Sequence, residues 1–514
     1  MIASFTALYA LNPLSVAVCH DSMRVTVITL YAHPRVSERV GARRFGARAR
    51  RRAPHTATRA TTATMYALRR RALGAAREQI HARLARGASA ANATAATTRD
   101  VAMATTQGGV RAKSAGAHHL GDFSDKGFHD RPLALEHNGG LKEYSVVYTD
   151  RAINHMSPVF CETMKNIDGM MKRAYNASGV VIMPGSGTYG MEAVARQWCS
   201  GKKALVIRNG YFSYRWTDIF EQTQIPSETI VMRGRAVDDE KTPAFAPPPL
   251  AEVVEMINKE KPAVVFAPHV ETSTGIILPD SYIKAVADAV HAHGGLFVLD
   301  SIASGTIWVD MKATGVDAIL SAPQKGWTGP ACASVIMLGE RGVHATRNSQ
   351  STSMVINMRK WLEVMDAYLA GGFAYYTTMP TDALTLFERA AMATEKVGFD
   401  KVKQMAWDLG TECRKMMASK GLKSVAAKGF EAPGVVVSYT DDATMFAKFK
   451  SKGFQIAAGV PFMINEPAGN NTFRIGLFGL DKIMNKDNCI NTLEPTLDEI
   501  LRENAEAAGA EAAS

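Results

Sequence analysis

Three segments of the sequence combine residue types that could do chemistry, and each follows a short apolar run. A glycine-rich turn spans Pro184–Gly190. Asp300 comes directly after one apolar run, and Lys325 lies four residues beyond another. The carboxyl ends of parallel strands lie at one edge of a sheet, and ligands bind just outside that edge. We therefore expect an anion cradle, a poorly solvated carboxylate and a nucleophilic amine to meet in one site.

The glycine-rich turn, Pro-Gly-Ser-Gly-Thr-Tyr-Gly, has two readings as a phosphate site. Its glycines let backbone N–H groups approach an anion, and a following helix would add the positive end of its dipole. The spacing of Gly185, Gly187 and Gly190 also satisfies the dinucleotide-binding pattern of an NAD-dependent dehydrogenase. That alternative requires an acidic residue after the next strand, which instead ends in Arg208 and Asn209. For this segment alone, a plain tight turn without a ligand also stays open.

Asp300 and Lys325 narrow these readings when they are taken together with the turn. Alone, Asp300 could be a helix N-cap or part of a core ion pair, and Lys325 could be an ordinary surface lysine. Pyridoxal phosphate requires a lysine to form a Schiff base, an aspartate to keep the ring nitrogen protonated, and a cradle for the phosphate. The sequence therefore predicts a pyridoxal-phosphate enzyme with Lys325 and Asp300 as its catalytic residues.

Alternating short apolar runs and helix-length segments must position these groups. The predicted strands are Val180–Met183, Ala204–Arg208, Thr229–Met232, Ala263–Ala267, Leu296–Leu299, Ala318–Ser321 and Ser334–Leu338. The predicted helices between them are Tyr189–Cys199, Tyr211–Gln222, Leu250–Asn258 and Ser281–His293. Apolar strands alternating with helices are typical of a three-layer α/β domain with a mainly parallel central sheet.

The last part of the chain has a different pattern. A long helical region at Leu384–Lys420 precedes shorter predicted elements at Gly434–Tyr439, Ala443–Lys450, Phe473–Leu477 and Thr492–Glu503. This pattern predicts a smaller α+β C-terminal domain. We therefore divide the folded part into a large cofactor-binding domain, residues 140–385, and a small domain, residues 386–514, whose tail Ala505–Ser514 we expect to be frayed.

The first hundred residues differ in composition from the rest of the chain. They hold 17 Arg, no Lys and four acidic residues, a net +13 that leaves −3 for the other 414 residues. Arginine-rich, acid-poor text is typical of an organellar transit peptide, so we expect residues 1–139 to be a transit peptide and a disordered linker. The arginine density favours a mitochondrion over a plastid. A peroxisome, a basic nucleic-acid-binding arm and a misassigned start codon stay open.

Composition also argues against several classes of partner. The near-neutral body shows no nucleic-acid-binding signature. No run of eighteen or more apolar residues predicts a membrane span. The six cysteines lie far apart, with no C-x-x-C pair or zinc spacing, so we expect no metal site.

Five segments, in this order, resemble the class V aminotransferases of fold type I, nearest to the alanine–glyoxylate and serine–glyoxylate group. They are Gly185–Thr188, His269–Gly275, Asp300–Ser304, Ser321–Lys325 and Phe473–Gly479. The resemblance covers about Tyr144 to Leu501 and implies the fold type I architecture with pyridoxal 5'-phosphate as cofactor.

The resemblance also implies a role for each matching position. Lys325 would hold the cofactor and shuttle the substrate's proton, and Asp300 would pair with the ring nitrogen. The further cofactor-binding residues that it implies are Ser186, Gly187, Thr188, Phe212, Thr272, Gln324, Tyr375 and Thr378. Phe212 would stack on the ring, and Arg474 would bind the substrate carboxylate as a bidentate fork. Tyr375 and Thr378 would reach the neighbouring subunit's phosphate, which implies a homodimer.

The activity implied is a ping-pong transfer of an amino group from alanine or serine to a 2-oxo acid, with glyoxylate as acceptor and glycine as product. A 2-aminoethylphosphonate–pyruvate aminotransferase is the nearest alternative, but we can name no cationic groups for a phosphonate. A cysteine desulfurase would place histidines where Gln324 and Phe212 stand. The Gly-Pro-rich opening that frames the family's substrate pocket is absent from Leu141–Asp150, so the resemblance does not imply a preference among amino donors.

Overall fold

The computed structural model describes residues 138–149, 151–469 and 471–513. The predicted transit peptide and nearly all of the predicted linker lie outside the described residues. Within the described part, no helix is both long and apolar enough to cross a membrane.

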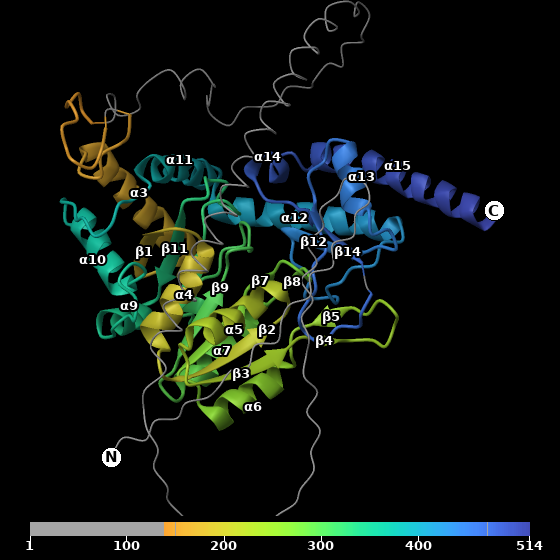
Figure 1. Ribbon diagram of the computed structural model, residues 1–514, viewed down its shortest axis with the longest axis horizontal. Coiled ribbons are helices and arrows are strands. Elements are labelled where there is room, and N and C mark those ends of the chain that lie inside the picture. The colour runs from red at the N-terminus through yellow and green to blue at the C-terminus, as the bar shows by residue number, and fades with distance from the viewer. Residues whose placement is uncertain (1–137, 150, 470, 514) are drawn as a thin grey trace, which may run out of the picture. The chain divides into compact units, whose positions relative to one another are not determined.

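A seven-stranded sheet in the order β1-β11-β10-β9-β6-β2-β3 forms the centre of the described part (Figure 1). Its strands are β1 (Gly179–Pro184), β2 (Lys203–Arg208), β3 (Glu228–Arg233), β6 (Val264–Pro268), β9 (Leu296–Asp300), β10 (Ala318–Ser321) and β11 (Ala333–Leu338). β11 pairs antiparallel with β1 and β10, and the other neighbouring strands are parallel. The predicted mainly parallel sheet is therefore confirmed, and all seven predicted strands lie in it.

Four helices connect the parallel strands, as the sequence predicts. They are α4 (Gly187–Trp198), α5 (Tyr211–Thr223), α6 (Leu250–Glu260) and α7 (Asp280–His291). Right-handed crossovers in this strand order put α4 and α5 on one face and α6 and α7 on the other. The contacts of α4 with α5 and of α6 with α7 agree with that placement. Helices on both faces explain why the central strands are almost entirely buried.

Two helices that contact β1, α3 (Pro158–Tyr175) and α10 (Met358–Leu369), were not predicted from the sequence. α3 begins at Ser157, whose side chain accepts a hydrogen bond from the backbone N–H of Phe160. It packs against α10 and against α11 (Thr381–Val397). Ser157 at the N-cap followed by a proline was a start signal that sequence analysis could have used.

The C-terminal part holds an antiparallel sheet in the order β12-β14-β13. Its strands are β12 (Val435–Tyr439), β13 (Ala457–Ala458) and β14 (Thr472–Gly476). The surrounding helices, drawn in the blue shades of Figure 1, are α12 (Phe399–Ser419), α13 (Met445–Ser451), α14 (Leu480–Ile483) and α15 (Lys486–Ala513). These elements build a second hydrophobic core. The domain boundary at residue 385 stays a prediction.

The predicted long helical region is confirmed and consists of two helices, because Gly398 lies between α11 and α12 with φ of 100°, a conformation that favours glycine. One prediction for this part was wrong. The tail predicted to be frayed continues α15 as far as Ala513. Alanine and glutamate, which dominate the end of this helix, both have high helix propensity.

Short elements complete the described part. They are β4 (Arg235–Ala236), β5 (Phe245–Ala246), β7 (Val270–Glu271), β8 (Ile276–Ile277), α8 (Met311–Thr314) and α9 (Glu340–Arg347). Of these, the hairpin of β7 and β8 follows β6 and matters most for function, because it carries residues of the candidate site.

Candidate active site

The segments that follow the parallel strands carry the predicted site. β1 leads into the glycine-rich turn, and β10 leads into the Lys325 loop. β9 ends at Asp300, which pairs in register with Pro268 of β6 and Leu320 of β10. The strand ends therefore align at one edge of the sheet, where ligands bind in this class of fold.

Lys325 lies in a tight loop after β10 and is half-buried. Its Nζ lies 6.0 Å from the centre of the Phe478 ring. Burial lowers the pKa of Lys325, and the nearby guanidinium groups of Arg474 and Arg215 lower it further, whereas the Asp300 carboxylate acts in the opposite direction. A lowered pKa gives the amine more of its neutral, nucleophilic form.

Asp300 is buried at the end of β9, with 8% of its surface exposed. Its Oδ1 accepts a hydrogen bond of 3.0 Å from the backbone N–H of Ile302. Burial raises the pKa of Asp300 to about 7; Glu271 adds to the rise, while the Ile302 N–H, Arg215 and Lys325 oppose it. A cation in contact with this buried carboxyl group would stabilise its ionised form.

The glycine-rich turn is shaped to admit a ligand at the N-terminus of α4. Gly185 has φ of 128°, in the range where other residues are strained. A Cβ on Gly187 would lie 2.3 Å from Cδ1 of Ile302, so a larger residue there would press on that side chain. Ser186 is the N-cap of α4, yet its side chain makes no capping hydrogen bond. The Ser186 hydroxyl is thus available to an anion at the helix N-terminus.

Phe212 is held at the start of α5 by Glu271, a fully buried carboxylate on β7. The two carboxylate oxygens of Glu271 accept hydrogen bonds from the backbone N–H groups of Phe212 and Ser213, at 3.1 and 2.8 Å. They also accept from the hydroxyls of Ser213 and Ser273, at 2.7 and 2.8 Å. The carboxylate thus fixes the start of α5, and with it Phe212, to the β7–β8 hairpin, next to Thr272.

Arg474, on β14 of the smaller sheet, reaches the same place. The carbon at the centre of its guanidinium lies 5.7 Å from the centre of the Phe212 ring. Its Nε donates to the backbone oxygen of Ala458 at 2.9 Å. Burial lowers the pKa of Arg474, and the Glu271 carboxylate opposes that shift. Arg474 therefore lies among the predicted residues although it is distant in the sequence.

The remaining predicted residues differ in position. Thr272 is half-buried beside Glu271, and Gln324 is exposed next to Lys325. Tyr375 is 57% exposed, and its hydroxyl lies 3.2 Å from Oγ1 of Thr378. Within the described subunit, Tyr375 and Thr378 form no hydrogen bond with Lys325, and their assignment to a neighbouring subunit's site stays a prediction.

Two residues of the site were not singled out from the sequence. Glu271 lies in the His269–Gly275 segment, where only Thr272 received a role; a glutamate three residues beyond the apolar run 263–268 was the signal. Arg215 follows Phe212 by one helical turn, a spacing that puts both side chains on the same helix face. Its Nη1 donates to Oγ1 of Thr188 at 2.9 Å.

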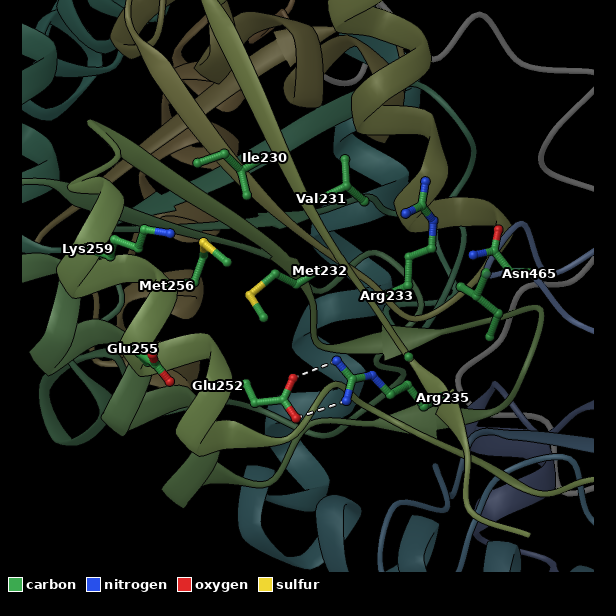
Figure 2. Close-up of a pocket in the computed structure, with 12 residues that line it drawn as sticks. Ile230, Val231, Met232, Arg233, Arg235, Glu252, Glu255, Met256, Lys259 and Asn465 are labelled. Carbon is green, nitrogen blue, oxygen red and sulfur yellow. Dashed lines mark hydrogen bonds and ion pairs between the residues drawn. The ribbon is translucent and has the colours of Figure 1, made fainter. Parts of the chain in front are cut away.

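A separate hollow of about 500 Å³ lies along the edge strand β3 (Figure 2). Met232 and Met256 are among its apolar lining residues, and Arg235 forms an ion pair with Glu252 on one side. None of its lining residues belongs to the strand-end site. We therefore do not treat this hollow as the active site.

Comparisons with known proteins agree with the geometry. The sequence profile of the family "Aminotransferase class-V" matches residues 141–437. The chain belongs to this family.

Relatives match most of the folded part. Alanine–glyoxylate aminotransferase 1 of Saccharomyces cerevisiae is 26% identical over 353 residues, which cover 64% of this chain and 86% of the yeast protein. L-aspartate–glyoxylate aminotransferase of Paracoccus denitrificans is 24% identical over 338 residues, covering 64% and 81%. A crystal structure of alanine–glyoxylate aminotransferase from Nostoc sp. shares the fold, with a TM-score of 0.59 and 18% identity; the match covers 72% of this chain and 92% of that one.

The cofactor of this class V aminotransferase is pyridoxal phosphate, and the residues present fit it. Gly187 leaves the glycine-rich turn without a side chain where a Cβ would clash with Ile302, and Ser186 has a hydroxyl not used in capping. Among the described residues, only the Ile302 N–H donates to the Asp300 carboxylate, so one oxygen can receive the ring nitrogen's proton. The dehydrogenase alternative is not favoured, because β2 ends at Arg208 without an acidic residue.

Proposed function

We propose that this aminotransferase moves the amino group of a small amino acid, alanine or serine, to glyoxylate and so forms glycine. The observation that carries the proposal is the arrangement of Lys325, Asp300 and Arg474 around the strand-end site. A nucleophilic amine, a buried carboxylate and a cation for a substrate carboxylate are together what transamination requires. The two named relatives, whose names both include glyoxylate, support the choice of acceptor.

The residues of the chain have separate tasks in the proposed reaction. Pyridoxal phosphate, when bound, supplies a ring that accepts the electrons of the broken Cα–H bond. Asp300 holds the proton on the ring nitrogen. Nζ of Lys325 takes the proton from the substrate Cα, and the lowered pKa of Lys325 makes the neutral amine available for this. Arg474 binds the substrate carboxylate and so orients the Cα–H bond.

A donor screen tests the proposal. The full chain, loaded with pyridoxal phosphate, is given glyoxylate together with alanine, serine or aspartate labelled at nitrogen. We expect the label to appear in glycine with alanine or serine, and not with the variant Lys325→Ala. Aspartate is included because one relative is named for it. Label that reaches glycine from aspartate alone would overturn the choice of donor. In a parallel reaction pyruvate replaces glyoxylate; label that reaches alanine there from serine or aspartate, with none reaching glycine from any donor, would overturn the choice of acceptor.

We also propose that the enzyme is a homodimer with sites at the subunit interface. An exposed apolar surface supports this; its members are Leu141, Tyr144, Val146, Val147, Met354, Val355, Phe373 and Tyr375. The ring centre of His155 lies 5.6 Å from that of Tyr148, 5.8 Å from that of Phe373 and 5.5 Å from that of Tyr375, so the first and last of the surface's three sequence regions adjoin. The Tyr376 hydroxyl donates a hydrogen bond to the backbone oxygen of Met354, which joins the middle region to the last. Exposed apolar patches of this kind mark protein interfaces. A second copy that covers this surface would shield Tyr375 and bring it toward another site.

Finally, we propose that residues 1–139 direct the chain to a mitochondrion. The support is compositional: 17 Arg, no Lys and four acidic residues in the first hundred positions. Residues 1–139 fused to a fluorescent protein should reach mitochondria, and a fusion beginning at residue 140 should not. Accumulation of the first fusion in plastids, peroxisomes or the cytosol would contradict the proposal.

A further inference from the structure

Arg215 lies beside the glycine-rich turn and, among the described residues, forms no ion pair with a carboxylate. It is half-buried on α5, and Nη1 donates to the Thr188 hydroxyl at 2.9 Å. The carbon at the centre of its guanidinium lies 5.3 Å from the centre of the Phe212 ring. Among the described residues, no aspartate or glutamate forms an ion pair with Arg215, although several other arginines have one. Partial burial of a cation without a neighbouring anion costs solvation free energy, so a bound anionic ligand would stabilise Arg215 in this position.

The phosphate of the cofactor is the anion that fits this position. A phosphate monoester carries a charge of about −1.5 to −2 at neutral pH, whereas a helix N-terminus supplies only about +0.5. Ser186 and Gln324 are uncharged, and Lys325 is committed to the aldehyde. Within the described subunit, Arg215 is the only cationic side chain with a hydrogen bond to a residue of the glycine-rich turn.

We propose that Arg215 is a cofactor-binding residue that balances the charge of the phosphate and orients the Thr188 hydroxyl toward it. The proposal rests on pyridoxal phosphate as the cofactor of the proposed function and extends it by one residue that the family resemblance did not supply. Arg474, the other arginine beside the Phe212 ring, is left for the substrate carboxylate, so the two arginines serve opposite ends of the cofactor.

The test compares two ligands that differ only in the phosphate. Apoprotein of the full chain is titrated with pyridoxal phosphate and with pyridoxal, and binding is followed by absorbance and tryptophan fluorescence. The variants are Arg215→Gln, Arg215→Lys and a control, Arg233→Gln, which changes an exposed arginine at the end of the neighbouring β3. Competition between inorganic phosphate and pyridoxal phosphate for the apoprotein is measured in the same assay.

We expect Arg215→Gln to weaken pyridoxal phosphate binding by about 10- to 100-fold, the usual loss for a hydrogen bond to a charged group, and to leave pyridoxal binding almost unchanged. Arg215→Lys should recover part of the loss, and Arg233→Gln should behave as wild type. Inorganic phosphate should compete in wild type and much less in Arg215→Gln.

Two results would overturn the proposal. Equal weakening of both ligands by Arg215→Gln would mean that Arg215 supports the ring through Phe212, and unchanged binding of both would mean that it has no part in the site. The selective loss of pyridoxal phosphate binding in Arg215→Gln can be measured without transamination. If this loss is found but the wild-type protein transfers no amino group to glyoxylate, the proposed function is refuted and this inference stands.

Discussion

Asp300 and Lys325 have opposite pKa shifts with a shared physical cause. Burial disfavours the charged form of each, which raises the pKa of Asp300 to about 7 and lowers that of Lys325. The shift of Asp300 makes its neutral form accessible near neutral pH, and the shift of Lys325 increases the neutral fraction of the amine. A cofactor with a protonated ring nitrogen and an electrophilic aldehyde matches both groups. The positive ring nitrogen would stabilise the ionised form of Asp300, and the aldehyde would react with the neutral amine of Lys325.

The raised pKa of Asp300 predicts a pH-dependent stability of the apoprotein. Because the pKa is higher in the folded than in the unfolded chain, the associated stability is fully present below about pH 4 and is lost as the pH rises through about 7. Asp300→Asn has no carboxyl group to titrate and so does not lose this stability. The difference in Tm, variant minus wild-type apoprotein, should therefore increase by a few °C between about pH 5 and 8. A Tm difference that stays constant with pH would contradict the assignment.

At the scale of elements, the Lys325 loop depends on close contact between two backbone segments. A Cβ on Gly326 would lie 1.9 Å from the carbonyl oxygen of Gly305, in the segment after β9. Both contacting segments are backbone, so this clash cannot be relieved by rotating a side chain. Gly326→Ala should displace the loop, lower the free energy of unfolding by about 2 kcal/mol or more, and reduce retention of the cofactor. Unfolding by urea and absorbance of the purified protein measure both effects.

A second glycine provides the control for this substitution. A Cβ on Gly372 would have as its nearest neighbour the backbone oxygen of Ala367 at 3.6 Å, an ordinary contact. Gly372→Ala should leave stability and cofactor retention close to wild type. If Gly326→Ala behaves in the same way, the contact between the two segments does not position Lys325.

The strand-end part of the fold could be predicted because its signals are local. Most of the strands are continuous apolar runs. Asp300 follows one such run directly and Lys325 lies four residues beyond the next, so parallel pairing of β9 and β10 brings them to the same edge of the sheet. The break at Gly398 was missed because the helical pattern continues on both sides of it. Glu271 and Arg215 were missed because their roles depend on contacts with Ser213 and Thr188, which no spacing along the chain encodes.

At the scale of the whole molecule, the exposed apolar surface predicts an obligatory second copy. Val146 is fully exposed in the single subunit, and Val146→Glu would place a charge within the proposed interface. We expect the wild type to be a dimer by light scattering and the variant to shift toward monomer with weaker cofactor retention, since Tyr375 would lose its place. Val237→Glu, at a 57% exposed valine outside this surface, should remain dimeric. A monomeric wild type would refute the dimer.

The most direct test of the account is chemical fixation of the cofactor. Full-length protein purified with pyridoxal phosphate is reduced with borohydride, digested, and examined by mass spectrometry. We expect a yellow protein that loses its colour on reduction and carries the cofactor on Lys325, whereas Lys325→Ala carries none at that position. A label on another lysine of the wild type, or a wild-type protein that takes up no label at all, would contradict the claim that Lys325 holds the cofactor.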